Sequence, residues 1–281
     1  MKKIFFMAVA LLMTGFQLFA QGIVVNKTDG TKVYFPAEQV ESVSTYGYGE
    51  GPKLVKQTFT ANGVSFVMVS IPGGTFQMGS EDSDADSDEK PVHQVTLSDF
   101  SIGQTEVTQE LWEAVMGSNP SNFKGAKRPV EMVSWNDCQT FITKLNELTG
   151  KKFRLPTEAE WEFAARGGSN SLGYKYAGSN SIDDVAWYTV NSGSTTHEVA
   201  TKLPNELGLY DMSGNVWEWC QDWYGSYGSS NQTNPTGATS GSRRVLRGGS
   251  WRSNVWGCRV AIRGYSTPTV TDISLGLRLA L

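Results

Sequence analysis

The chain has 281 residues, of which 39 % are hydrophobic and 19 % are charged, and its formal net charge is −4. This length allows one large domain with an additional segment, and the acidic balance gives no basic field for binding nucleic acid. The 30 glycines and 9 tryptophans predict a loop-rich body that is held together by aromatic packing rather than by long regular elements.

The first 20 residues have the pattern of a signal peptide. Lys2 and Lys3 precede an apolar run over 4–16 that is too short to span a bilayer. We expect cleavage after Ala20, and no later apolar run is long enough to cross a membrane. The sequence therefore predicts an exported protein that does not span a membrane and is located in the periplasm, on the cell surface or outside the cell.

Residues 21–52 are predicted to form a small N-terminal β-hairpin segment with a linker. Two apolar strands over 23–35 flank Asp29-Gly30, a dipeptide typical of a type I′ hairpin turn. The remaining chain, 53–281, is predicted to be the main domain.

The first part of the main domain reads as short strands. Two strands are predicted on either side of the Pro-Gly-Gly break at 72–74, and a strand-like alternation continues over 93–103. Between them, residues 81–89 place acidic side chains at nearly every second position. This run lacks the glycine and the final glutamate of an EF-hand loop, so it is predicted to be a solvated surface loop.

Two helices are predicted on either side of the middle of the domain. Thr108–Met116 is short and ends at a glycine. Thr157–Arg166 opens with a capping box in which Thr157 and Glu160 satisfy each other's backbone N–H groups. Glu158 and Glu162 lie four residues apart on one face, which is predicted to be solvated. Beyond residue 169 the periodicity fades into turns and short strands.

A third helix is predicted over Ser134–Leu148. Ser134 is its N-cap, and Asp137 stands three residues later, as in a capping box. Its apolar side chains recur with a helical period and predict one buried face. They are Trp135, Cys138, Phe141, Ile142, Leu145 and Leu148.

The segment 204–225 concentrates tryptophans around a turn. The run from Asp211 to Glu218 has side-chain oxygens at its two ends and backbone carbonyls between them. A loop of this kind can wrap a calcium ion, which takes six to eight oxygen ligands. The tryptophans Trp217, Trp219 and Trp223 are predicted to bury the loop and fix its shape.

This segment resembles the formylglycine-generating enzyme (sulfatase-modifying factor) family, and five further segments resemble that family's motifs in the same order. The segments are 73–80, 91–117, 129–138, 154–168 and 244–251. The resemblance extends from about residue 65 to the C-terminus. It implies an irregular, loop-rich α+β fold of the formylglycine-generating-enzyme type, related to C-type lectins, with short helices, a small twisted sheet and structural calcium.

The resemblance also implies the calcium ligands. They would be the side chains of Asp211 and Glu218 and the backbone carbonyls of Gly214 and Val216. The family usually has Asn where Asp211 stands. An acid at this position adds charge and favours the same site.

The catalytic cysteines of the family are not both retained. In active members, two cysteines five residues apart form a linear bis-thiolate copper(I) site that activates oxygen. Here Ser253 stands at the first position. Cys258 follows five residues later, but aligning 259–263 with the family's Arg-x-Ala-x-Arg places Cys258 outside the catalytic position, because this loop is about three residues shorter. We therefore predict that copper does not bind. Cys258 is catalytic only if the other alignment holds, and a disulfide between Cys220 and Cys258 stays open.

Three functions are compatible with these residues. We favour an exported member that has lost the oxidase chemistry and binds a protein, peptide or glycan ligand with calcium as a structural ion. The alternatives are a family enzyme with altered oxidative chemistry and a formylglycine-generating oxidase of sulfatase cysteines. In each case Trp217, Trp219, Glu218 and Arg247 are predicted to be scaffold residues rather than catalytic ones.

Overall fold

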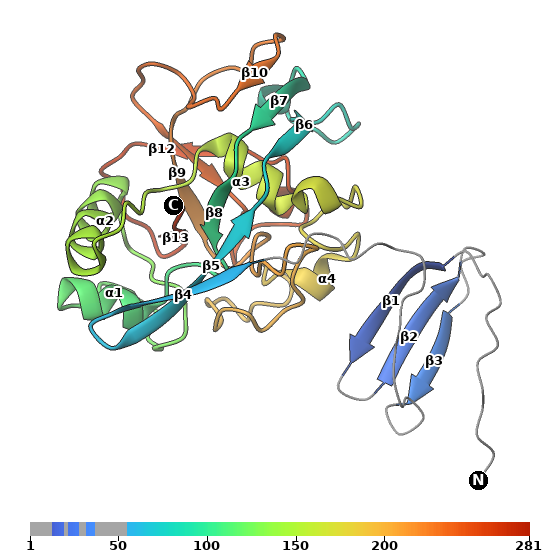
Figure 1. Ribbon diagram of the computed structural model, residues 1–281, viewed down its shortest axis with the longest axis horizontal. Coiled ribbons are helices and arrows are strands. Elements are labelled where there is room, and N and C mark those ends of the chain that lie inside the picture. Colours follow the sequence, from blue (N-terminus) through green and yellow to red (C-terminus); the bar gives the residue numbers. More distant parts are fainter. Residues whose placement is uncertain (1–12, 20–21, 28–31, 37–54) are drawn as a thin grey trace. The chain divides into compact units, whose positions relative to one another are not determined.

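The computed structural model divides the chain into two units, Met1–Gly51 and Pro52–Leu281, each drawn as a ribbon in Figure 1. The residues that it describes are 13–19, 22–27, 32–36 and 55–281. Among them, no helix has both the length and the apolar composition that crossing a membrane requires.

The N-terminal unit contains one antiparallel sheet of three strands. The strands are β1 (Met13–Phe19), β2 (Gly22–Lys27) and β3 (Lys32–Pro36), in the order β1-β2-β3. The pair β2–β3 is the hairpin predicted from the alternation of apolar residues, although its turn, Asp29-Gly30, lies outside the described residues. Strand β1 is an addition that lies within the predicted signal peptide. The signal peptide stays a prediction, because residues 1–12 and Ala20 are not described.

The C-terminal unit has three small sheets instead of one. The first, β4-β5-β8, contains β4 (Lys56–Ala61), β5 (Val64–Ile71) and β8 (Phe100–Gly103). The second, β10-β7-β6, contains β6 (Gly74–Met78), β7 (His93–Leu97) and β10 (Gln232–Thr233). The third, β12-β11-β9-β13, contains β9 (Trp217–Trp223), β11 (Arg244–Arg247), β12 (Gly264–Ser266) and β13 (Leu275–Leu277). Short strands joined by long loops confirm the predicted α+β, loop-rich class.

The three predicted helices begin and end at their caps. They are α1 (Gln109–Met116), α2 (Trp135–Thr149) and α3 (Glu158–Ala165). The N-cap hydroxyls of Thr108, Ser134 and Thr157 each accept from the backbone N–H three residues later, and the capping boxes of α2 and α3 are complete. Helix α1 ends at Gly117 in the left-handed conformation (φ 81°).

Two features differ from the expectation. Leu148, predicted to lie on the buried stripe of α2, is 48 % exposed, because the stripe reaches the last turn, where the helix leaves the core. The one-turn helix α4 (Ile182–Val185) and the 3₁₀ turns η2 (Ser87–Glu89), η3 (Gly168–Asn170) and η4 (Trp256–Cys258) carry no signal in the periodicity. Four residues or fewer are too short to show a helical period.

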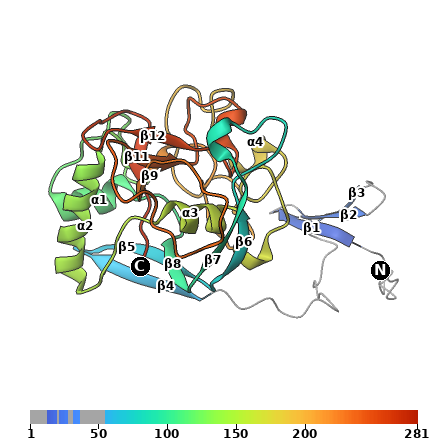
Figure 2. The same cartoon turned by 90° about the horizontal axis from the view of Figure 1, so that it is seen from above.

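Helix α3 lies in the interior of the C-terminal unit. All eight of its residues are buried, and it packs against β6 and β7 as well as β9 and β11. Figure 2 shows α3 in the middle, between the β4–β5 strands and the β9–β11–β12 strands. Helices α1 and α2 cover a separate hydrophobic cluster with β4. A helix buried on every side must also satisfy its charged residues inside the protein.

Candidate functional site

The carboxylates of α3 form ion pairs inside the core. Glu162 is fully buried, and its oxygens accept from Nε of Arg166 at 2.8 Å and from Nη2 of Arg247 at 2.5 Å. Glu158 accepts from Nε and Nη2 of Arg263 at 2.6 and 2.8 Å. The prediction of a solvated face is therefore wrong. The two acids do share a face, but that face meets arginine side chains from distant segments instead of water.

Arg247 fixes the loop that follows the Gly-Gly turn. In addition to its ion pair with Glu162, it donates to three consecutive carbonyls at 2.6–3.0 Å, those of Val260, Ala261 and Ile262. Burial raises the pKa of Glu162, but the charges of Arg166 and Arg247 outweigh burial, so the net shift is downward and the carboxylate stays ionised. Arg247 is therefore a scaffold residue, as predicted.

Strand β9 places the tryptophan-rich segment in the core. Trp219 is fully buried and donates Nε1 to a backbone carbonyl at 3.0 Å. Glu218, also fully buried, accepts from Nε1 of Trp161 at 2.6 Å and from Nη2 of Arg278 at 2.7 Å. Trp217 is only partly buried and packs at the edge of the core. These contacts agree with the scaffold role predicted for the segment.

Three of the predicted calcium ligands, Asp211, Gly214 and Val216, lie on the loop that leads into β9, and the fourth, Glu218, is the second residue of that strand. Asp211 is buried with a left-handed backbone (φ 58°), and its Oδ2 accepts from the N–H of Ala200 at 2.8 Å. Gly214 has φ 84°, and a Cβ added there would lie 2.3 Å from the carbonyl oxygen of Trp187. Only glycine fits at this position. The absence of a side chain lets the loop lie directly against the backbone of Trp187.

Glu106 is an acid of this site that the sequence interpretation missed. It is 1 % exposed, and its Oε1 accepts from the N–H of Val216 at 3.0 Å. Burial raises the pKa of Glu106 well above its ordinary value, and the charges of Asp211 and Glu218 raise it further. Burial likewise raises the pKa of Asp211 to about 6. In this part of the described chain, three carboxyl groups share one guanidinium, that of Arg278.

These contacts bear on the calcium prediction. Within residues 55–281, no three His, Cys, Asp or Glu side chains are grouped so that they could hold a metal ion by themselves, so carbonyls such as those of Gly214 and Val216 would have to take part. Both oxygens of Glu218 already accept from Arg278. The excess of buried carboxyl groups over the one guanidinium of Arg278 fits a cation. Calcium stays a prediction.

In the cysteine loop, the thiol of Cys258 is buried and Ser253 closes a turn. Cys138, Cys220 and Cys258 are all buried free thiols, so the disulfide left open by the sequence does not form. Burial raises the pKa of Cys258 to about 12, which keeps the thiol protonated at neutral pH. The Oγ of Ser253 accepts from the N–H of Ser250 at 3.0 Å and closes a turn. These contacts do not bring two thiols together as ligands for copper(I).

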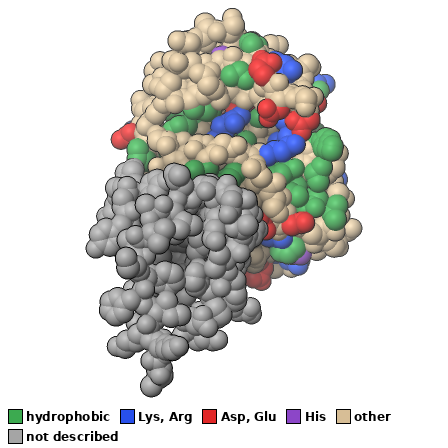
Figure 3. All heavy atoms as spheres, turned by 90° about the vertical axis from the view of Figure 1, so that its right-hand side faces the viewer, with side chains coloured by type: hydrophobic (Ala, Val, Ile, Leu, Met, Phe, Trp, Pro, Cys, Tyr) green, Lys and Arg blue, Asp and Glu red, His purple; other side chains and the backbone are tan. Residues whose placement is uncertain are grey.

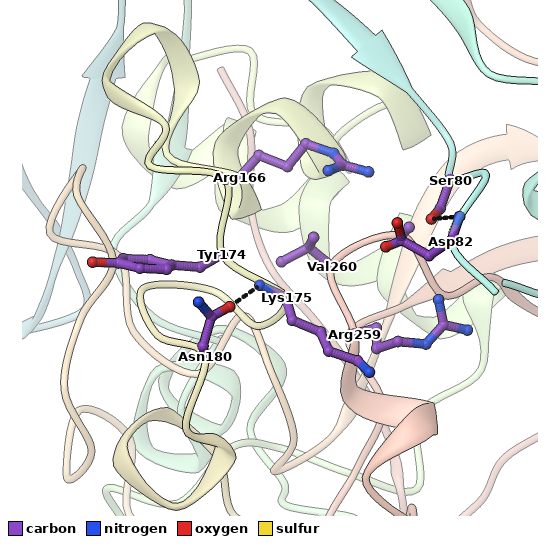
Figure 4. Close-up of a pocket in the computed structure, with 10 residues that line it drawn as sticks. Ser80, Asp82, Arg166, Tyr174, Lys175, Asn180, Arg259 and Val260 are labelled. Atoms are coloured by element: carbon purple, nitrogen blue, oxygen red, sulfur yellow. Dashed lines mark hydrogen bonds between the residues drawn. The ribbon is translucent and has the colours of Figure 1, made fainter. Parts of the chain in front are cut away.

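A polar pocket of about 270 Å³ lies beside this loop. Its lining comes from the end of β6, the C-terminus of α3, the loop before α4 and the segment after η4: Ser80, Asp82, Arg166, Gly173, Tyr174, Lys175, Asn180, Arg259, Val260 and Ala261. Figure 4 shows Arg166 on one side of Val260 and Lys175 and Arg259 on the other, while the ring of Tyr174 points away. Figure 3 shows basic and acidic side chains close together on one face of the molecule.

The loop after the Gly-Gly turn also presents an aromatic side chain next to the pocket. Trp256 is 50 % exposed, and Nζ of Lys175 lies 6.0 Å from the centroid of its ring. Tryptophan is enriched among the residues that dominate binding at protein interfaces. The segment that carries the catalytic cysteines in the resembled family therefore presents Trp256 here, beside Lys175 and the pocket.

Sequence reasoning missed Glu106, Arg278 and the pocket. Glu106 lies between the strand-like segment 93–103 and the helix predicted from Thr108, and no spacing marks it. Arg278 lies in the C-terminal Leu-Gly-Leu-Arg run, where no neighbouring acid marks it as the partner of a buried carboxylate. The basic residues of the pocket are isolated in the sequence, at 166, 175 and 259, and only a contact between distant segments could have identified them.

Comparison with known proteins supports the same fold. The "Chaperone protein LppX" of Paenibacillus barcinonensis is 37 % identical over 266 residues, covering 77 % of this chain and 89 % of that protein. The formylglycine-generating enzyme of Thermomonospora curvata is 31 % identical over 288 residues, covering 76 % and 92 %. The structure of Treponema denticola variable protein 1 is 40 % identical, with a TM-score of 0.74, and covers 80 % of this chain and 98 % of that chain.

The model of one protein family matches nearly the whole C-terminal unit. It is described as the sulfatase-modifying factor enzyme 1-like domain, and it matches residues 56–281. The fold predicted from the motifs, an irregular body of the formylglycine-generating-enzyme type, is that of these relatives. The chain therefore belongs to the sulfatase-modifying factor enzyme 1-like family.

Proposed function

We propose that this chain is an exported binding protein of the family that lacks copper-dependent formylglycine oxidase activity. The observation that carries the proposal is the loop after Gly248-Gly249. Ser253 takes the place of one thiolate, and the thiol of Cys258 is buried and protonated. A copper(I) site of two thiolates needs both.

The same loop supports a binding role. It carries the half-exposed Trp256 next to a polar pocket, and tryptophan with arginine is enriched at the centres of protein interfaces. One relative is named a chaperone protein and a structural neighbour a variable protein, neither of which names an oxidase. The proposed ligand is a protein or peptide rather than a glycan, because four of the ten residues that line the pocket are charged: Asp82, Arg166, Lys175 and Arg259.

The protein is expected to leave a Cys-x-Pro-x-Arg peptide unchanged with or without copper(I). Mass spectrometry of the peptide would detect the mass loss that accompanies conversion of a thiol to an aldehyde. Conversion that is abolished by Cys258→Ser would restore the oxidase function, for which the similarity to the formylglycine-generating enzyme of Thermomonospora curvata is the argument.

Binding is tested by selecting peptides from a random display library on the full chain. Peptides selected on the wild type are expected to bind Trp256→Ala at least about tenfold more weakly, as for an interface hot spot. Because half of this ring is exposed, the variant should keep the wild-type melting temperature. If no peptide is selected, or if the selected peptides bind Trp256→Ala equally well, this surface is not the binding site.

Calcium is proposed as a structural ion of the loop between Asp211 and Glu218. Its support is the excess of buried carboxyl groups over guanidinium groups there. Thermal melts with calcium and with a chelator are expected to differ, since an ion at a hundredfold excess over its dissociation constant adds about 2.7 kcal/mol. Asp211→Ala should reduce the difference, while the exposed control Glu147→Ala should keep it. Equal midpoints in wild type with calcium and chelator would exclude the site.

A further inference from the structure

We propose that the polar pocket binds an acidic peptide segment, one carboxylate of which contacts Arg166 and Lys175 in competition with the protein's own acidic loop 81–89. The inference rests on the binding function proposed above and specifies the chemistry of its ligand. Four observations carry it: unused donors, a surface ion pair that can exchange, a charge that disfavours phosphate, and an adjacent apolar ring.

Two cationic side chains in the pocket, Arg166 and Lys175, have N–H groups that can donate further hydrogen bonds. Arg166 uses Nε for Glu162 and Nη2 for the carbonyl of Gly79, and within residues 55–281 its Nη1 makes no hydrogen bond. Its side chain is 23 % exposed. The Nζ of Lys175 donates to Oδ2 of Asp84 at 2.5 Å, and its side chain is 40 % exposed. An ammonium group has three donors, so Lys175 can donate a hydrogen bond to another carboxylate.

The ion pairs around the pocket differ in burial. Arg259 and Glu89 are buried and joined by two hydrogen bonds at 2.6 and 2.8 Å. Breaking such a pair leaves an uncompensated buried charge, so a ligand is not expected to separate Arg259 from Glu89. The Lys175–Asp84 pair is at the surface, where an ion pair contributes little to stability. A ligand carboxylate can therefore replace Asp84 at Lys175 with little loss.

The acidic loop 81–89 can compete with a ligand carboxylate for Lys175. Its ends are joined by a hydrogen bond from the N–H of Ser80 to the carbonyl of Glu89 at 3.2 Å, so Asp84 is held near the pocket, and Asp82 lines it. A tethered group competes at a high effective concentration. The charge of Lys175, through its hydrogen bond, also lowers the pKa of Asp84, which keeps this competitor ionised. The sequence predicted only a solvated loop here.

Asp82 and Trp256 favour a carboxylate on a peptide over phosphate. Figure 4 shows the carboxylate of Asp82 directed toward the space in front of Val260. Its charge repels any anion, and it repels phosphate, with about two negative charges at neutral pH, more than a carboxylate with one. Trp256 offers an apolar surface beside Lys175 that a peptide side chain can cover and that inorganic phosphate cannot.

The experiment measures binding of fluorescein-labelled hexaglutamate and hexaglutamine to the full chain by fluorescence anisotropy. Hexaglutamate is expected to bind and hexaglutamine is not, and the affinity should fall as sodium chloride rises from about 50 to about 300 mM. Lys175→Met should weaken hexaglutamate binding about tenfold, and the double variant Asp82→Asn/Asp84→Asn should strengthen it about threefold or more, since one kcal/mol changes affinity about fivefold.

The matched controls are Lys144→Met and Glu147→Gln, two exposed residues of α2 that should change nothing. Equal binding of the two peptides, or a double variant that binds hexaglutamate no more tightly, overturns the inference. Displacement of hexaglutamate by an equal concentration of inorganic phosphate overturns it too and identifies a phosphate site. If display selection depends on Trp256 but Lys175→Met has no effect on the selected peptides, the binding function stands and this inference fails.

Discussion

Replacing Arg278 by Met is expected to prevent folding or to lower the free energy of unfolding by about 3–5 kcal/mol, the cost of removing one partner of a buried ion pair. Arg278 is fully buried and donates to Glu218 and to the carbonyls of Gly103 and Tyr210. Without its charge, Glu106, Asp211 and Glu218 would be three buried carboxyl groups with no cation among them. The free energy of unfolding of a whole domain is only about 5–15 kcal/mol, so this loss would be a large part of it.

Urea unfolding measures this effect. Arg252→Met is the matched control, because Arg252 also forms an ion pair, with Asp272, but its side chain is 48 % exposed. It should cost about 1 kcal/mol or less. Arg278→Lys keeps a charge and provides a folded variant if Arg278→Met does not fold. If Arg278→Met and Arg252→Met unfold at the same urea concentration, the buried acids do not depend on Arg278.

The loss in free energy of unfolding caused by Arg278→Met should become larger as the pH rises. Burial raises the pKa of Asp211 from 3.8 to about 6 in the folded protein, so between these values the folded state binds more protons than the unfolded state. Stability therefore falls as pH rises through this window. Removing Arg278 takes away a charge that lowers the pKa of Asp211, so the variant should lose more stability at pH 7 than at pH 5.

Trp219→Ala is expected to lower the free energy of unfolding by about 3–5 kcal/mol, the usual range for removing a buried tryptophan. Trp219 is fully buried in the cluster that contains α1 and α2, and its Nε1 hydrogen bond to the carbonyl of Val133 ties β9 to the start of α2. Its loss would leave a cavity and a carbonyl without its donor.

Thermal melts of Trp219→Ala and Trp256→Ala distinguish a tryptophan that stabilises the fold from one that lies on the surface. Trp256 is the matched control, since the same substitution is made at a side chain that is 50 % exposed. Trp219→Ala should melt many degrees lower, whereas Trp256→Ala should melt as the wild type does. If a folded Trp219→Ala of wild-type stability failed to bind the selected peptides, Trp219 would belong to the binding site instead of the scaffold.

The sequence by itself determined the features that depend on neighbouring residues. Helix starts are an example, because the hydrogen bonds that fix them join residues three apart, as in Ser134 with Asp137 and Thr157 with Glu160. The presence of Ser253, and not a cysteine, five residues before Cys258 is also a property of the sequence. Ordered motifs over most of the chain were enough to identify the family and the fold.

Only the tertiary structure decided which charges are buried and with which partner. Glu158 and Glu162 have the spacing of a solvated helix face, yet their partners Arg263 and Arg247 lie 105 and 85 residues away in the sequence. Arg259 and Glu89 are 170 residues apart. The desolvation of a charge depends on everything packed around it, and local spacing contains no information about segments that arrive from elsewhere. For the same reason the pocket, built from four separate segments, could not be found in the sequence.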